Sequence, residues 1–108
     1  MKATTLLREL GQALDDLHVA IDNATLDHVT HPGKDTTATR ANAVRMNDAG
    51  NFACDLLRDA RQAVRAKPVP ADVRALARLE RRLREMLLNY LPSYLDDLGE
   101  DDDRHAYH

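Results

Sequence analysis

Apolar residues recur every three or four positions across residues 4–29, and this spacing predicts one long amphipathic helix. The steps along the stripe alternate between four and three residues, as they do along the seam of a coiled coil. Aspartates occupy positions off the stripe, so we expect one buried face and one solvated face. The stripe consists of Leu10, Leu14, Leu17, Ile21 and Ala24, extended by Leu6 and Leu7.

The segment "THPGKD" ends this helix, because Pro32 disfavours helical geometry at the preceding residue and Gly33 tolerates a positive φ. A second helix is predicted over residues 37–66. Asparagines and Gly50 in its first half have low helix propensity, so the sequence leaves open whether residues 38–51 belong to it. Its apolar stripe is Met46, Ala49, Ala53, Leu56, Ala60 and Ala63, flanked by Phe52, Leu57 and Val64.

A third helix is predicted over residues 71–91, because Pro70 suits a first helical turn and Pro92 cannot continue a helix. A short fourth element follows, with Tyr94, Leu95 and Leu98 directed inward. The apolar face of the third helix comprises Val73, Leu76, Leu79, Leu83, Met86, Leu87 and Tyr90.

These elements predict an all-α fold: an antiparallel three-helix bundle with a short fourth helical segment and an acidic C-terminal tail. Residues 1–98 form the single domain, and residues 99–108 form a polar, flexible tail. The length of 108 residues suits one domain that buries a core without cross-links.

Composition indicates where in the cell the protein is located. A single cysteine, Cys54, excludes an internal disulfide, and no apolar run approaches the roughly 20 residues that span a bilayer. No signal peptide is recognisable at the N-terminus. We expect a cytoplasmic protein without membrane association. Its content of alanine, arginine, leucine and aspartate is typical of bacterial or phage proteins.

The chain lacks the motifs of common enzymes. No P-loop, dinucleotide-binding glycine motif or nucleophile elbow occurs. Cys54 lies in mid-helix without a cationic neighbour, which indicates a packed residue rather than a nucleophile. Adjacent acids such as Asp15 and Asp16 diverge on a helix and do not form a catalytic dyad. We expect no enzyme activity, no catalytic residue and no cofactor.

The histidines offer one alternative, a metal-binding bundle. His28 and His31 are three residues apart, and His105 and His108 repeat that spacing in the tail. A zinc site needs three or four converging ligands, and a flexible tail supplies weak ligand geometry. We favour a fraying helix end and a solvated tail, and we assign no metal ligand.

Charge is segregated along the chain. Residues 61–95 carry eight basic and three acidic side chains, whereas residues 96–108 carry one basic and six acidic side chains. On the third helix, Arg74, Arg78, Arg81 and Arg82 lie along one side, with Arg84 nearer its flank. This arginine face could be solvated, dock an acidic protein or bind nucleic-acid phosphates. An isoelectric point of about 5.9 and 4% aromatic residues weigh against nucleic acid.

The acidic tail has three interpretations of its own. It could keep the protein soluble, cover the arginine face until a partner displaces it, or mimic the phosphates of a nucleic acid.

We predict a small non-enzymatic protein that acts by protein–protein interaction, as a regulator, adaptor, immunity protein or inhibitor. A nucleic-acid-associated regulator using the arginine face is the alternative. A homodimer formed through Tyr90, Leu91, Tyr94 and Leu95 is a further expectation. The predicted partner-binding residues are Arg74, Arg78, Arg81, Arg82, Tyr90 and Tyr94.

Overall fold

The computed structural model describes residues 2–30, 32–33 and 37–98, and this part of the chain is helical without any strand. Three long helices and one short helix follow in sequence: α1 (Ala3–Thr30), α2 (Thr37–Ala66), α3 (Pro70–Tyr90) and α4 (Tyr94–Asp97). The predicted all-α bundle is confirmed. The tail, residues 99–108, lies outside the described residues.

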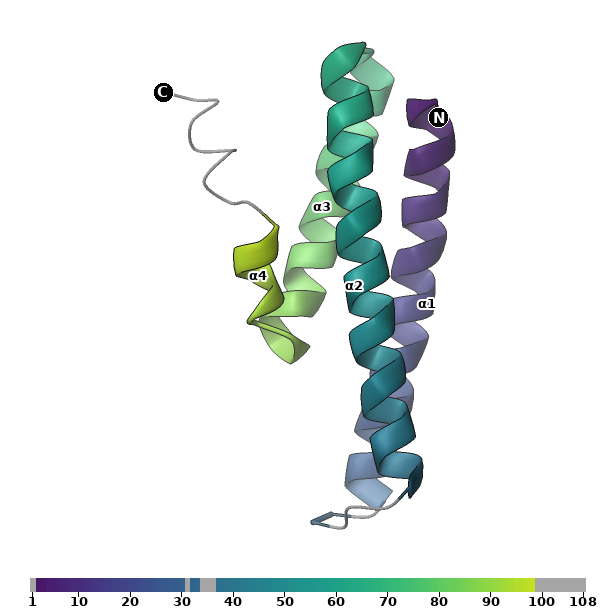
Figure 1. Cartoon of the computed structure of the whole chain (residues 1–108), viewed down its shortest axis with the longest axis vertical. Helices are drawn as coiled ribbons and strands as arrows, with labels where there is room; N and C mark the ends of the chain where they lie inside the picture. The colour runs from purple at the N-terminus through teal and green to yellow at the C-terminus, as the bar shows by residue number, and fades with distance from the viewer. Residues whose placement is uncertain (1, 31, 34–36, 99–108) are drawn as a thin grey trace.

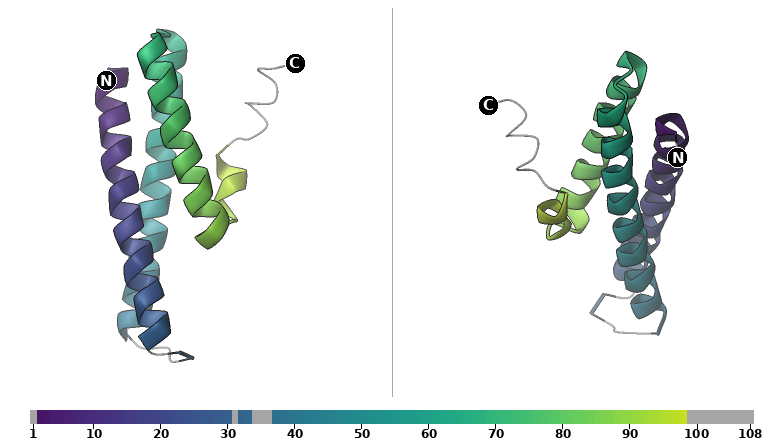
Figure 2. Two further views of the ribbon diagram at one scale, coloured as in Figure 1. Left: turned by 180° about the vertical axis from the view of Figure 1, so that it is seen from behind. Right: turned by 45° about the horizontal axis from the view of Figure 1, so that its top comes forward.

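The helices form a long hairpin with a shorter third helix packed on part of it. α1 and α2 run antiparallel, and α3 returns along the hairpin from the end that holds the N-terminus (Figure 1). α3 has 21 residues against 28 in α1 and 30 in α2. It therefore stops short of the end of the hairpin where α1 ends and α2 begins, as the reverse view shows (Figure 2).

α2 is continuous, which settles the question left open for residues 38–51. The helix passes through Gly50, which is buried. A Cβ atom there would come within 2.9 Å of Leu91 Cδ1 and Tyr94 Cε2. A side chain larger than that of glycine would therefore push Leu91 or Tyr94 away, so glycine permits the close approach of α4 although it lowers helix propensity.

Apolar side chains from all three long helices form one core. Leu10, Leu14 and Leu17 of α1 pack with Leu57 of α2 and Leu83 of α3, and all five are fully buried. Cys54 is 1% exposed, which confirms it as a packed residue. Within the described helices, the last buried residue of α1 is Ile21 and the first of α2 is Gly50.

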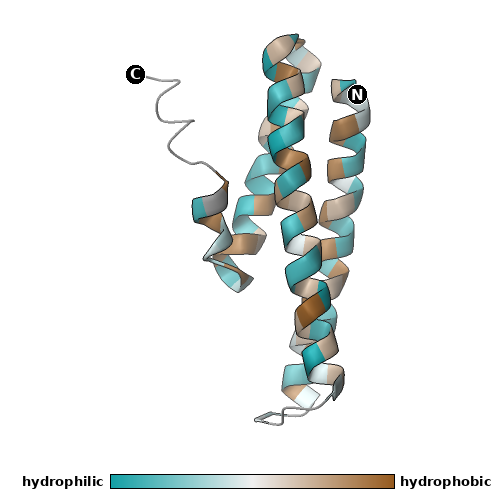
Figure 3. Ribbon diagram, in the orientation of Figure 1, coloured by the Kyte–Doolittle hydropathy of each residue, from teal (hydrophilic) through white to brown (hydrophobic). Residues whose placement is uncertain are grey.

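The hairpin beyond those two residues has no fully buried side chain among the residues that the structure describes. We call residues 22–30 and 37–49 the distal end of the hairpin. α3 does not reach it, yet apolar positions continue along the lower part of α2 (Figure 3). Apart from Tyr94, which contacts Asn47 near its upper edge, the distal end is a two-helix structure, which can bury less apolar surface than three packed helices.

Three residues predicted to pack inward are exposed instead. Phe52 flanks the stripe of α2 on a side that no other described helix covers, and Val73 and Tyr90 lie near the two ends of α3. The inward placement of Leu98 is confirmed, while Tyr94 and Leu95 are half-buried against the core.

Candidate protein-binding surface on α3

Three arginines form an exposed row on the outward face of α3. Arg74, Arg78 and Arg81 follow one another at steps of four and three residues, so they share one side of the helix. None of them lies within ion-pair distance of an acidic side chain in the described part of the chain. The row is thus a cluster of positive charge without an ion pair in the described part of the chain, and Glu85 continues the same side one turn after Arg81.

The remaining arginines of the predicted face form ion pairs within the fold. Arg82 lies on the flank toward α1, where its Nη2 atom is 2.8 Å from Asp15 Oδ1. Its predicted place in the outward row is therefore wrong, because a step of one residue turns the side chain by about 100°. Arg84 lies on the opposite flank, as predicted, with Nη2 3.4 Å from Glu80 Oε1.

Glu80 is the centre of a half-buried charge cluster. Its carboxylate accepts hydrogen bonds from Arg84 and from Arg61 of α2. Arg61 also donates to the backbone carbonyl of Leu98, which follows α4. The cluster joins α2, α3 and the end of α4 and so fixes the flank of α3 on which the groove opens.

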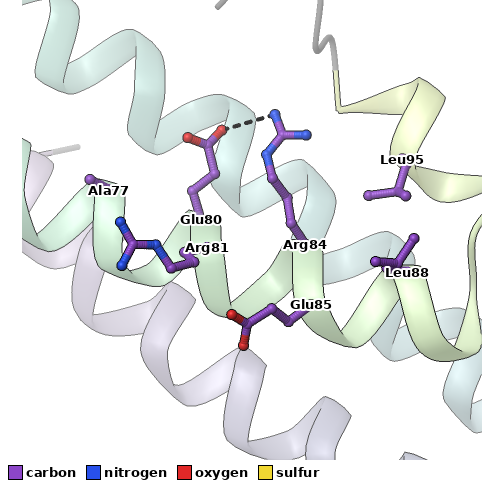
Figure 4. Close-up of a pocket in the computed structure, with 7 residues that line it drawn as sticks. All are labelled: Ala77, Glu80, Arg81, Arg84, Glu85, Leu88 and Leu95. Carbon is purple, nitrogen blue, oxygen red and sulfur yellow. Dashed lines mark hydrogen bonds and ion pairs between the residues drawn. The ribbon is translucent and has the colours of Figure 1, made fainter.

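An open groove of about 490 Å³ lies beside this cluster, between α3 and α4 (Figure 4). Its wall combines apolar and charged side chains, and Leu88 is 63% exposed. In Figure 4, Leu88 and Leu95 lie side by side at one end, while Arg81 points away from Glu80 toward the other. The lining residues are Ala77, Glu80, Arg81, Arg84, Glu85, Leu88 and Leu95.

The two predicted tyrosines differ in their surroundings. Tyr90 is exposed at the end of α3. Tyr94 is half-buried, and its hydroxyl lies 3.0 Å from Asn47 Oδ1 on α2. Its ring lies beside Gly50. Tyr94 therefore anchors α4 to α2, while Tyr90 remains accessible.

The four residues expected at a homodimer contact differ in burial. Leu91 is buried, and Leu95 is half-buried at the groove. Of the four, Tyr90 alone is exposed.

The described residues add nothing to the metal-binding alternative. Among them, no group of three His, Cys, Asp or Glu side chains lies close enough to hold a metal ion. His28 is exposed near the end of α1. His31, His105 and His108 lie outside the described residues.

A second exposed apolar strip lies on α1 and was not among the surfaces predicted from the sequence. Val19, Leu26 and Val29 are 57%, 65% and 70% exposed. Their spacing of seven and three residues places them on one side of a helix, and this spacing could have revealed the strip from the sequence. The buried stripe of α1 masks this signal, because it has the same periodicity and larger side chains.

Within the described part of the chain, no helix has the length and apolar character needed to cross a membrane. Comparisons of the chain with protein-family models, with curated proteins and with solved structures give no match.

Proposed function

We propose that this chain is a non-enzymatic protein that binds an acidic surface of another protein chain. The contact surface is the outward side of α3, defined by Arg74, Arg78, Arg81 and Leu88 and continued by the groove; we call it the α3 surface. The observation that carries the proposal is the row of three exposed arginines without an acidic partner in the described fold.

The mixed character of the α3 surface favours a protein over a nucleic acid. Phosphate binding needs positive charge alone, and base stacking needs aromatic rings. The α3 surface instead places Leu88 and Ala77 beside Arg81. Protein interfaces combine arginine at the contact with apolar anchors in this way.

The size and fold of the chain suit a regulator, adaptor, immunity protein or inhibitor. A bacterial or phage origin and a cytoplasmic location are part of the same proposal, supported by composition and the single cysteine. An acidic partner is expected because the three arginines would then form ion pairs upon binding.

A charge reversal with a matched control tests the proposal. The test variant is R74E/R78E/R81E. The control is R8E/R45E/R65E, which makes the same change in net charge at three exposed arginines outside the α3 surface. A photo-crosslinking residue at exposed position 77 first captures bound chains in the host cell. Binding of each purified captured chain to the three forms is then measured.

A protein partner whose affinity falls about 30-fold or more in the test variant, and less than about threefold in the control, supports the proposal. Equal losses in both variants would show a nonspecific charge effect and refute it. A crosslink to DNA or RNA, with affinity falling steeply as salt rises, would establish the nucleic-acid alternative instead.

A further inference from the structure

α1 carries a second seam that begins under α3 and continues beyond its end. Gly11 faces Leu79 of α3, since a Cβ atom added to this glycine would lie 3.9 Å from Leu79 Cδ2. Asp15 pairs with Arg82 one turn later. Further steps of four or three residues reach Val19, Asp22, Leu26 and Val29, which therefore lie on the same side of α1. We call these last four residues the distal seam.

The distal seam has the composition of a helix-packing surface, but none of the described helices lies on it. α3 ends at Tyr90 because Pro92 interrupts it, and it stops short of the end of the hairpin where α1 ends and α2 begins (Figures 1 and 2). Val19, Leu26 and Val29 remain more than half exposed. Asp22, between them, pairs only with His18 of its own helix among the described side chains, at 3.2 Å.

The α3 surface and the distal seam are complementary in apolar character and, at Arg81 and Asp22, in charge. One offers Ala77, Leu88 and three arginines that have no acidic partner among the described residues, and the other offers Asp22 with three aliphatic side chains. The upper part of the same seam already binds a basic helix, through the Arg82–Asp15 pair. We infer that the distal seam of one chain binds the α3 surface of a second copy of this chain, and the reverse, in a symmetric dimer.

The lengths of the two surfaces agree with an antiparallel approach. The stretch from Arg74 to Arg84 extends about 15 Å along α3, as does the seam from Val19 to Val29 along α1. When Asp22 is set opposite Arg81 of the second copy, Leu26 falls opposite Ala77 and Val29 opposite Arg74. The aliphatic stem of an arginine can cover a valine while its guanidinium stays in water.

Twofold symmetry follows from where the two surfaces lie. A second hairpin, turned end for end, would bring its distal end over α3 of the first chain, and its own α3 over the distal end of the first. Each α3 would then lie between two hairpins. One such contact is small compared with the roughly 800 Å² per partner of stable interfaces. The symmetric dimer makes the contact twice and leaves no open surface for further growth.

This inference rests on the proposed function, because it names a second copy as the partner of the α3 surface. Sedimentation velocity of the full chain, from about 1 µM to about 1 mM, tests it. We expect a species of twice 12.1 kDa. R81D and D22R should each raise the dimer dissociation constant about 100-fold, since either change places like charges at both contacts. Arg81 and Asp22 are exposed, so the fold should tolerate both changes.

The decisive sample is a mixture of the two variants. R81D and D22R chains, each monomeric alone, should form a heterodimer, because every contact then pairs opposite charges again. The double variant D22R/R81D should recover the homodimer for the same reason. Controls R45D and D59R, exposed and outside both surfaces, should leave the dissociation constant within about threefold of the wild type.

A chain that stays monomeric throughout, or a dimer unchanged by R81D and D22R, would overturn the inference. Dissociation by both variants without recovery in the mixture would also overturn it, because Asp22 and Arg81 would not face each other. The proposed function has a separate readout: it stands if R74E/R78E/R81E still loses an acidic partner while the wild type is monomeric.

Discussion

Two glycines lie inside long helices, and their surroundings differ. A Cβ at Gly11 would have its nearest neighbour at 3.9 Å, which is an ordinary contact, whereas one at Gly50 would press on Leu91 and Tyr94 at 2.9 Å. In the sequence, Gly50 stands out only as a residue of low helix propensity. Its role appears only when α4 is packed against α2, since the contacting residues follow more than 40 positions later.

G11A should therefore stabilise the protein by about 0.5–1 kcal/mol, because alanine is the better helix former. G50A should destabilise it by about 1–2 kcal/mol, because overpacking outweighs the same propensity gain. Urea unfolding followed by circular dichroism measures both. Equal effects of the two substitutions would mean that α4 moves aside without cost.

Glu80 is the acid on which the flank of α3 depends. Its side chain is 19% exposed, and those of Arg61 and Arg84 are 11% and 22% exposed. E80Q removes the carboxylate that both half-buried guanidinium groups contact, so we expect a loss of about 2 kcal/mol in unfolding free energy.

The matched control for E80Q is D15N, which removes the exposed pair with Arg82. This change should cost less than about 0.5 kcal/mol, because water and salt screen exposed ion pairs. Thermal unfolding of both variants at one pH gives the comparison. A larger effect for D15N would place the important charge contact at α1 rather than at the cluster.

At the scale of the element, α3 has one face that packs in the core and one face that is exposed. Leu83 and Leu87 are fully buried on one face, and Leu88 is exposed on the other beside the arginine row. The proposed function needs both, because the inner face holds the helix in place and the outer face remains available for contact.

Adjacent leucines on α3 separate these two faces experimentally. L87A should destabilise the fold by about 2–5 kcal/mol through cavity formation. L88A should change stability by no more than about 0.5 kcal/mol while weakening association through the α3 surface. Urea unfolding and a binding measurement on both variants check this. A strongly destabilising L88A would show that the residue belongs to the core.

Element order and the buried face of each helix were predictable because helical periodicity is a local property of the sequence. The row of Arg74, Arg78 and Arg81 was predictable for the same reason. The contacts of Arg82 with Asp15 and of Tyr94 with Asn47 were not predictable, because the two members of each pair are far apart in sequence. The exposed Val19 and Leu26 depend on where α3 ends relative to α1, and periodicity along one helix carries no such information.

At the scale of the whole molecule, the core is unevenly distributed. It extends from Leu6 to Ile21 on α1 and from Gly50 to Val64 on α2, and it includes one face of α3. The distal end of the hairpin has two helices and no fully buried residue among those described. Local opening should be easiest there, because few apolar contacts are lost when those turns unfold.

Hydrogen exchange should therefore divide the chain into two regions. In dilute protein, amides of residues 22–30 and 38–49 should open with free energies at least about 2 kcal/mol below those of residues 53–64. Mass-spectrometric or NMR exchange measures this directly. Uniform protection in dilute protein would contradict the two-helix description of the distal end. If a second copy covers the distal seam, raising the concentration should increase protection at residues 19–29 of the wild type but not of R81D, because only the wild type then gains contacts there.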